Sequence, residues 1–275
     1  MPLQLHISPC PNDTFIFDAL VNGRIDTGGL SFKVSFADIE RLNEIARGGE
    51  ADVDICKVSY ALLPHLAGRW RLLDSGGALG HGNGPLLVAA REVDRTDKSL
   101  RVAIPGEHTT AYLLLSKFFP HLTCTESCLF SEIAPQVAAG HFDAGVLIHE
   151  GRFTYEKYGL RLMADLGRMW EEATGLPLPL GAIVVSCKLP EALQREIERL
   201  IRASVEYALA HPEASADFVR AHARELDPAV TAQHIRLFVN EYSLSMGEKG
   251  RRAVGELLHS MTNYEKLFNF VSTKS

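Results

Sequence analysis

Residues 3–20 read LQLHISPCPNDTFIFDAL, and this stretch decides the fold class. Its first five residues alternate apolar and polar side chains, which is typical of a strand with one buried face. The segment SPCPNDT follows as a turn, and the apolar residues from Phe15 to Leu20 then recur at helical spacing until Gly23 ends the helix. A strand that turns directly into a helix begins a βα unit, so the N-terminus indicates an α/β protein.

The same alternation continues beyond this first unit. The pattern predicts strands near 31–36 and 53–57, a helix from about Asp38 to Gly48, and a further helix after Ser59. Strands that alternate with helices are joined by crossovers, and crossovers place neighbouring strands parallel. We therefore expect a parallel sheet in the N-terminal part of the chain.

A second α/β series follows a glycine-rich segment, GGALGHGNG at 76–84. It comprises expected strands at 100–104, 122–125 and 144–148 and expected helices at 110–118 and 132–139. Extended apolar runs at 85–90 and 180–186 connect the two series, and the sequence after Pro190 reads as helices that pack back on the first series. These features predict two lobes, 1–92 with 188–275 and 93–187. Two α/β lobes with two connections indicate a periplasmic-binding-protein-like fold of type II, with a ligand cleft between the lobes.

Composition excludes several classes of function. The 275 residues carry a formal net charge of −6, and no basic run is present that would bind a nucleic acid. The apolar runs are far shorter than the roughly 18 residues of a membrane span, and the first residues do not resemble a signal peptide. We expect a cytoplasmic protein with a small-molecule ligand, and the sequence does not predict its oligomeric state. Cys124 and Cys128 have a C-x3-C spacing, but no second Cys/His pair completes a metal site.

Ligands of parallel sheets bind beyond the carboxyl ends of the strands, and polar residues follow the first and third expected strands. Asn12, Asp13 and Thr14 lie in SPCPNDT, where they serve either as helix N-caps or as ligand contacts. Lys57 ends a strand in an apolar stretch, which fits a charge facing a bound anion or a surface lysine. Ser59 lacks a G-x-S-x-G motif, so hydrogen bonding to substrate or helix capping is favoured over nucleophilic attack.

Two further strand ends carry candidate residues in the second lobe. Thr109 and Thr110 open a helix after a glycine turn, where they either cap the helix or hold a carboxylate. His149 directly follows the strand at 144–148, at the ligand-binding end of a parallel sheet. A neutral imidazole accepts protons near pH 7, so His149 is a candidate general base or a structural histidine.

Several of these segments together resemble the 1,4-dihydroxy-6-naphthoate synthase family. The resemblance rests on SPCPNDTFIF at 8–17, KVSYA at 57–61, SGGALGHGNGPLLV at 75–88, PGEHTTAYLLL at 105–115, IHEGRFTY at 148–155 and TGLPLPLGAI at 174–183. It covers nearly the whole chain, and only the stretch after about Asn263 has no counterpart.

The resemblance implies a lyase that converts cyclic dehypoxanthine futalosine to 1,4-dihydroxy-6-naphthoate in the futalosine route to menaquinone, without a metal or organic cofactor. It also implies that His149 is the proton acceptor and that Lys57-Val58-Ser59 and Thr109-Thr110 line the substrate site. Two alternatives remain: chorismate dehydratase of the same route, from which the segment after the first strand differs, and a non-catalytic solute-binding protein, which would require export.

Overall fold

The computed structural model describes residues 1–48, 52–223 and 227–259. The stretch after Asn263, which resembles no part of the family, lies outside these residues. The described chain forms two compact units, one drawn from Met1–Gly80 and Pro179–Ser275 and the other from His81–Leu178. Both are α/β units, and no helix in the described ranges is long and apolar enough to cross a membrane.

The first unit is built on a sheet with the strand order β2-β1-β3-β11-β4, in which β5 also pairs with β11. Its strands are β1 (Leu3–Ile7), β2 (Phe32–Phe36), β3 (Ile55–Ser59), β4 (Trp70–Leu72), β5 (Ala78–Gly80) and β11 (Leu178–Ser186). β1 is parallel to β2 and β3, as the alternating pattern predicted. β11 is antiparallel to β3, and its Gly181 lies opposite Ser59 at the carboxyl end of β3.

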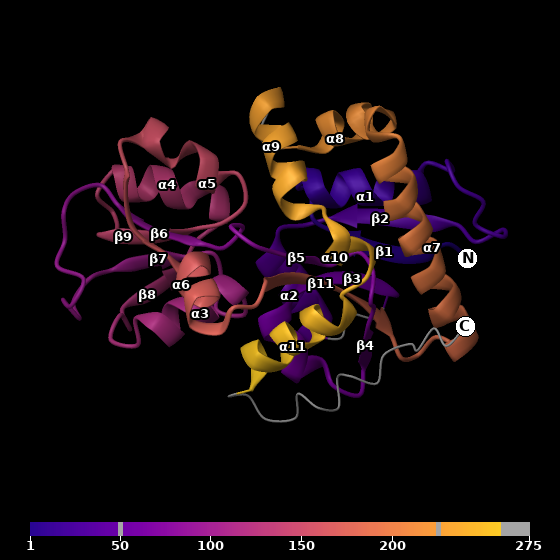
Figure 1. Ribbon diagram of the computed structural model, residues 1–275, viewed down its shortest axis with the longest axis horizontal. Coiled ribbons are helices and arrows are strands. Elements are labelled where there is room, and N and C mark those ends of the chain that lie inside the picture. Colours follow the sequence, from indigo (N-terminus) through magenta and orange to yellow (C-terminus); the bar gives the residue numbers. More distant parts are fainter. Residues whose placement is uncertain (49–51, 224–226, 260–275) are drawn as a thin grey trace. The chain divides into compact units, whose positions relative to one another are not determined.

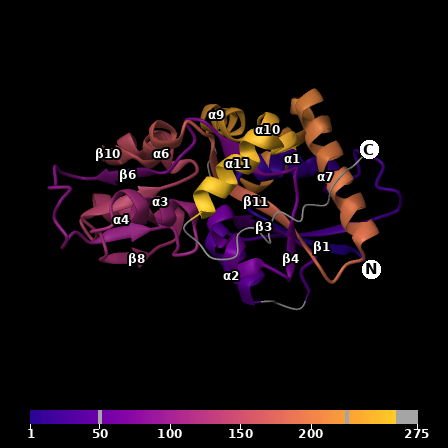
Figure 2. The same ribbon diagram turned by 60° about the horizontal axis from the view of Figure 1, so that its bottom comes forward.

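Helices cover both faces of this sheet. They are α1 (Pro11–Val21), α2 (Ile39–Gly48), the 3-10 helix η1 (Tyr60–Leu66), α7 (Glu191–Ala210), the 3-10 helix η3 (Pro212–Ser215), α8 (Ala216–His222), α9 (Pro228–Phe238), α10 (Glu241–Leu244) and α11 (Gly247–Leu258). α1 and α7 pack together on one face and α2 lies on the other (Figures 1 and 2). The buried residues Ile197, Ile201 and Val205 of α7 recur every fourth position, so one stripe of the helix joins the core formed with α1 and β1.

The second unit contains a sheet with the strand order β10-β6-β9-β7-β8. Its strands are β6 (Leu86–Ala89), β7 (Val102–Ile104), β8 (Thr125–Ser127), β9 (Ala144–Leu147) and β10 (Arg161–Asp165). β7 is parallel to β8 and β9, whereas β6 is antiparallel to β9 and β10. Leu86 pairs with both Leu147 and Asp165, so the carboxyl ends of β9 and β10 meet the start of β6 at one edge.

The helices of the second unit are α3 (Thr110–Phe118), α4 (Phe130–Ala138), α5 (Gly151–Thr154), the 3-10 helix η2 (Tyr155–Tyr158) and α6 (Leu166–Thr174). α4 and α5 lie on one face of its sheet and α3 and α6 on the other (Figure 1). At the edge where β6 begins, the segment before β6 packs directly on the start of α6. A Cβ atom added to Gly84 would lie 2.2 Å from the Cα of Gly167, so this backbone approach requires glycine.

Local patterns predicted several element boundaries correctly and others only approximately. The helix expected at 110–118 has these bounds, whereas the strand expected at 122–125 begins at Thr125, after a turn in which Leu122 N donates to Phe119 O. The helix expected after Ser59 is a 3-10 helix that contains Pro64, which has no backbone N–H for a longer α-helix. The region after Pro190 is helical in its described residues and belongs to the first unit, as expected.

Candidate active site

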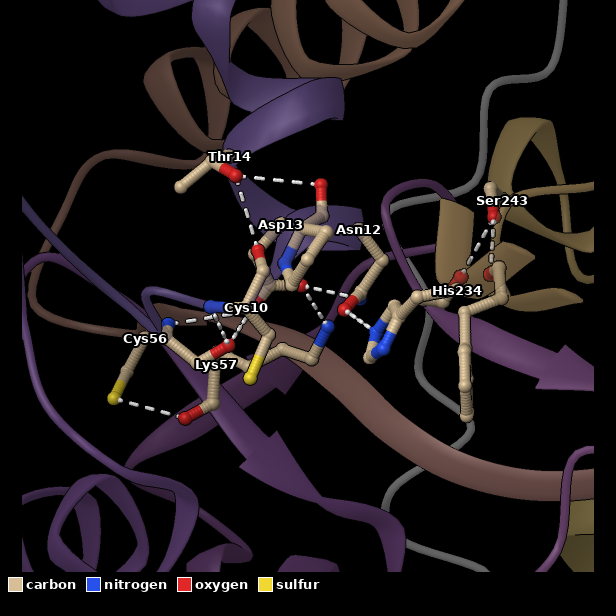
Figure 3. Close-up of polar contacts among 12 residues, drawn as sticks. Cys10, Asn12, Asp13, Thr14, Cys56, Lys57, His234 and Ser243 are labelled. Carbon is tan, nitrogen blue, oxygen red and sulfur yellow. Dashed lines mark hydrogen bonds and ion pairs between the residues drawn. The ribbon is translucent and has the colours of Figure 1, made fainter. Parts of the chain in front are cut away.

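A buried carboxylate organises the carboxyl end of β1 and β3 in the first unit (Figure 3). Asp13 is fully buried and accepts four hydrogen bonds: from Ser8 N (3.2 Å), Ser8 Oγ (2.7 Å), Asn12 Nδ2 (2.8 Å) and Lys57 Nζ (2.5 Å). These four donors satisfy the hydrogen-bonding capacity of a carboxylate that is shielded from solvent. The carboxylate therefore fixes the turn after β1 and Lys57 of β3 in one arrangement. β3 continues to Ser59, so Lys57 lies in the middle of the strand, whereas the sequence predicted it at the strand's end.

The Lys57 side chain is buried, with an exposed fraction of 4%, so the alternative of a surface lysine is wrong. It reaches Asp13 by passing over Gly181 of β11, where a Cβ atom would lie 2.5 Å from the lysine Cε. An ammonium group has three N–H donors, and within the described residues Lys57 Nζ donates to Asp13 alone. Two donors thus remain for a bound molecule.

A histidine that the sequence did not predict supports this cluster from α9. His234 is fully buried, and its Nε2 lies 2.9 Å from Asn12 Oδ1 (Figure 3). Because Asn12 Nδ2 donates to Asp13, its Oδ1 is the acceptor and His234 Nε2 carries the proton. The histidine therefore orients the Asn12 amide, which in turn contacts Asp13. No local signal marks it, because it lies far from Asn12 in sequence.

The other candidates of the first unit have defined partners. The expectation that Asn12 or Thr14 caps the first helix is wrong, since Cys10 is the N-cap of α1 and makes no side-chain capping bond. The Thr14 hydroxyl lies 3.1 Å from Cys10 O and 3.3 Å from Pro11 O, so it donates into the first helical turn. Ser59 N donates to Asn43 Oδ1 at 2.8 Å, and its hydroxyl lies 3.1 Å from Asn43 Nδ2.

The remaining first-unit candidate, Val58, has a fully buried side chain and pairs with Ala182 of β11. Its side chain therefore belongs to the core.

His149 follows β9 in the second unit and has a backbone φ of 52°. It is the one non-glycine residue with positive φ in the described part of the chain. A left-handed conformation costs a non-glycine residue about 1–2 kcal/mol, and such strain concentrates at functional sites. The half-buried imidazole meets the edge of the Phe130 ring at a centroid distance of 5.0 Å. The strained backbone and the ring contact together fix the imidazole at the carboxyl end of β9.

Thr109 and Thr110 are both buried at the start of α3. Thr109 is the N-cap: its hydroxyl donates to Gly106 O at 2.7 Å and accepts from Tyr112 N at 3.2 Å. Its backbone N–H also donates to Gly106 O, at 3.3 Å. The capping role is therefore confirmed for Thr109, and both of its donors are used within the turn.

The cysteines do not form a metal site in the described residues. Cys124 is exposed and Cys128 is half-buried, and no group of three His, Cys, Asp or Glu side chains with metal-binding geometry occurs in those ranges. Burial strongly raises the pKa of the Cys56 thiol, which keeps it protonated.

The chain also matches known proteins along most of its length. A family model described as menaquinone biosynthesis matches residues 3–263. The chain belongs to this family. Two proteins named 1,4-dihydroxy-6-naphthoate synthase are each 48% identical to it. The protein from Thermus thermophilus aligns over 255 residues, 93% of this chain and 92% of that protein. The protein from Streptomyces coelicolor aligns over 261 residues, 93% and 91% respectively. The sequence resemblance is thereby confirmed.

Solved structures identify the fold of this menaquinone biosynthesis family member. A crystal structure of a protein from Archaeoglobus fulgidus has a TM-score of 0.86 and 32% identity, and covers 94% of this chain and 96% of that one. A Candida albicans protein described as having the generic periplasmic binding protein fold has a TM-score of 0.68 at 12% identity, over 97% and 93% of the two chains. The expected two-lobed periplasmic-binding-protein-like fold of type II is confirmed.

Proposed function

We propose that this chain is a 1,4-dihydroxy-6-naphthoate synthase, a lyase that converts cyclic dehypoxanthine futalosine to 1,4-dihydroxy-6-naphthoate with release of the sugar-derived fragment. The observation that carries the proposal is the 48% identity to two proteins of that name over 93% of the chain. The proposal includes menaquinone biosynthesis as the route and the cytoplasm as the location.

His149 is proposed as the general base that removes a proton from the substrate. A neutral imidazole accepts a proton near pH 7, and positioned bases of this kind contribute about 10²- to 10⁴-fold to rate. The positive φ of His149 and its contact with Phe130 support this role, because both hold the ring in one orientation. A fixed base avoids the entropic cost of orientation during each turnover.

Substrate contacts are proposed for each unit by itself. In the first unit, Lys57, the Val58 backbone and Ser59 are proposed to contact substrate, and the two remaining N–H donors of Lys57 suit a substrate oxygen that gains negative charge. Asn12 and Thr14, in the first turn of α1, are proposed as further contacts of this unit. In the second unit, Thr109 and Thr110 at the start of α3 are proposed to contact substrate.

Turnover assays with two substrates test the proposal. Purified protein is incubated with cyclic dehypoxanthine futalosine and, separately, with chorismate, and the products are identified by mass spectrometry. We expect 1,4-dihydroxy-6-naphthoate from the first substrate and no enolpyruvyl benzoate from the second.

The outcomes separate the alternatives. Conversion of chorismate alone would identify a chorismate dehydratase, and binding without turnover of either compound would favour a solute-binding protein. The variant H149N should lower turnover, because it removes the proposed base. H141N is its matched control, because His141 is exposed in the same unit, and it should retain wild-type turnover.

A further inference from the structure

Arg152 in α5 lies three residues after His149 and has an incomplete set of hydrogen bonds. Its Nη2 donates to Gly82 O at 2.7 Å. Its Nε and Nη1 are buried, and neither has a hydrogen-bond partner in the described part of the chain. A guanidinium group carries five N–H donors, so one acceptor within the described residues leaves most of them unused. Buried donors without acceptors are rare in native proteins and point to a bound group.

The charge on Arg152 is supported at a distance, and no carboxylate of the described ranges forms an ion pair with it. Burial lowers the pKa of Arg152, whereas the nearby carboxylates of Asp165 and Glu171 act in the opposite direction. The oxygens of these carboxylates have other partners. Glu171 accepts from Gly82 N at 2.7 Å and contacts His81 Nδ1 at 3.1 Å, and Asp165 caps α6 by accepting from Arg168 N at 2.9 Å. The two acids therefore stabilise the cation while leaving its N–H groups to another acceptor.

The surroundings of Arg152 are held by regular structure. Gly82 precedes β6, whose Leu86 pairs with Leu147 of β9, so its carbonyl lies at the edge where His149 follows β9. Leu166 N donates to Pro85 O at 3.0 Å, which ties the same segment to α6. The Gly82 carbonyl that accepts from Arg152 is therefore held in place by β6 and by the start of α6.

The chemistry of the unused donors indicates the ligand. A guanidinium presents two forks, each of which matches the two oxygens of a carboxylate. A single acceptor, Gly82 O, occupies one position on Nη2, so a planar acceptor with two oxygens fits the fork that remains. Thr109 has no donor left to bind the same carboxylate, because its hydroxyl and its amide both donate to Gly106 O.

We propose that Arg152 binds the aromatic carboxylate of the substrate through two parallel hydrogen bonds. This inference rests on the proposed function, since both the proposed product and the sugar-bearing substrate carry that carboxylate. Arg152 is a binding and specificity residue, and His149 in the same turn is the base. One short segment would then both hold the anionic end of the substrate and carry out proton transfer.

Ligand binding with a matched pair of probes tests the assignment. Titration calorimetry with 2-naphthoate and with naphthalene-2-carboxamide compares a carboxylate and a neutral amide of the same shape. Wild type should bind the carboxylate more tightly, and R152Q should reduce carboxylate affinity about 10- to 100-fold while leaving amide affinity within twofold. R152K retains the positive charge but lacks the fork of two parallel donors, so its carboxylate affinity should lie between those of wild type and R152Q. If R152Q does not fold, R152K replaces it in the test. The control R168Q removes an exposed arginine of the same unit and should change neither affinity.

Each outcome is decisive. A wild type that binds neither probe, or that binds both equally, overturns the proposal, as does an R152Q variant that keeps the wild-type preference. Turnover of cyclic dehypoxanthine futalosine is measured in the same preparations. If wild type turns over cyclic dehypoxanthine futalosine but R152Q keeps the carboxylate preference, the role of Arg152 is wrong and the proposed function stands. If wild type does not turn over this compound but R152Q loses the carboxylate preference, the proposed function is wrong and Arg152 remains a carboxylate site.

Discussion

Lys57 Nζ lies 2.5 Å from Asp13 Oδ1, and both side chains are buried at the carboxyl end of the first-unit sheet. The pair joins the middle of β3 to the first turn of α1. A buried ion pair contributes little net stability compared with apolar residues of the same volume, yet removing one partner leaves an uncompensated charge. Its retention here fits a functional lysine whose position is fixed by a carboxylate.

The first prediction concerns this pair. D13N should lower the free energy of unfolding by about 3–5 kcal/mol, because the Lys57 ammonium then lacks its counter-charge. Urea unfolding measures the change. The control E44Q removes one partner of the exposed Arg41–Glu44 pair in the same unit and should cost at most about 0.5 kcal/mol. The double variant D13N/K57M should recover part of the loss; equal stability of D13N and wild type would contradict the argument.

The second prediction concerns Gly181, over which the Lys57 side chain passes. G181A places a Cβ atom 2.5 Å from Lys57 Cε, and the ion pair prevents the lysine from moving away freely. We expect a loss of about 1–3 kcal/mol in stability and weaker substrate binding. G255A, in a helix with no atom within 4 Å of the added Cβ, is the control and should not destabilise the protein. In a K57A background the cost of G181A should largely disappear.

The third prediction concerns His234 as a positioning residue for Asn12. Gln places its Nε2 close to the position of the histidine Nε2, whereas the shorter Asn does not reach Asn12 Oδ1. H234Q should therefore retain substrate affinity, and H234N should raise KM about 5- to 10-fold through loss of one hydrogen bond.

A double-mutant cycle tests whether His234 changes KM through Asn12. If His234 acts through Asn12, the change H234N should have no further effect on KM in an N12A background. Additive effects of the two substitutions would show that His234 supports the fold independently of Asn12.

Local sequence rules predicted the elements that carry the site but few of its contacts. The strand at residues 3–7 and the helix at 110–118 were predictable because periodicity and turn residues act within a few positions. Polar residues at the predicted strand ends identified Lys57 and His149 because parallel strands collect their carboxyl ends at one edge, although Lys57 lies inside β3.

Several contacts that the sequence did not predict are long-range. His234 meets Asn12 across 222 positions, and β11 inserts antiparallel beside β3 from a distant segment. Arg152 contacts Gly82 across 70 positions. The Asp13 cluster also displaced the expected helix cap, because tertiary partners offered that side chain more hydrogen bonds than the helix end did. Such competition depends on the whole fold and leaves no local pattern.

The last prediction separates the backbone role of His149 from its chemistry. Its φ of 52° suits glycine and asparagine better than other residues. H149N and H149G should therefore be at least as stable as wild type, whereas H149A should be about 1 kcal/mol less stable than H149G. All three variants lack the imidazole, so kcat should fall about 10²- to 10⁴-fold in each, with KM nearly unchanged. Thermal unfolding and steady-state kinetics of the same preparations measure the two effects, and H141N serves as the control. Loss of activity that followed stability across the three variants would indicate a structural histidine. Uniform loss of kcat despite their different stabilities would identify the imidazole as the proton acceptor.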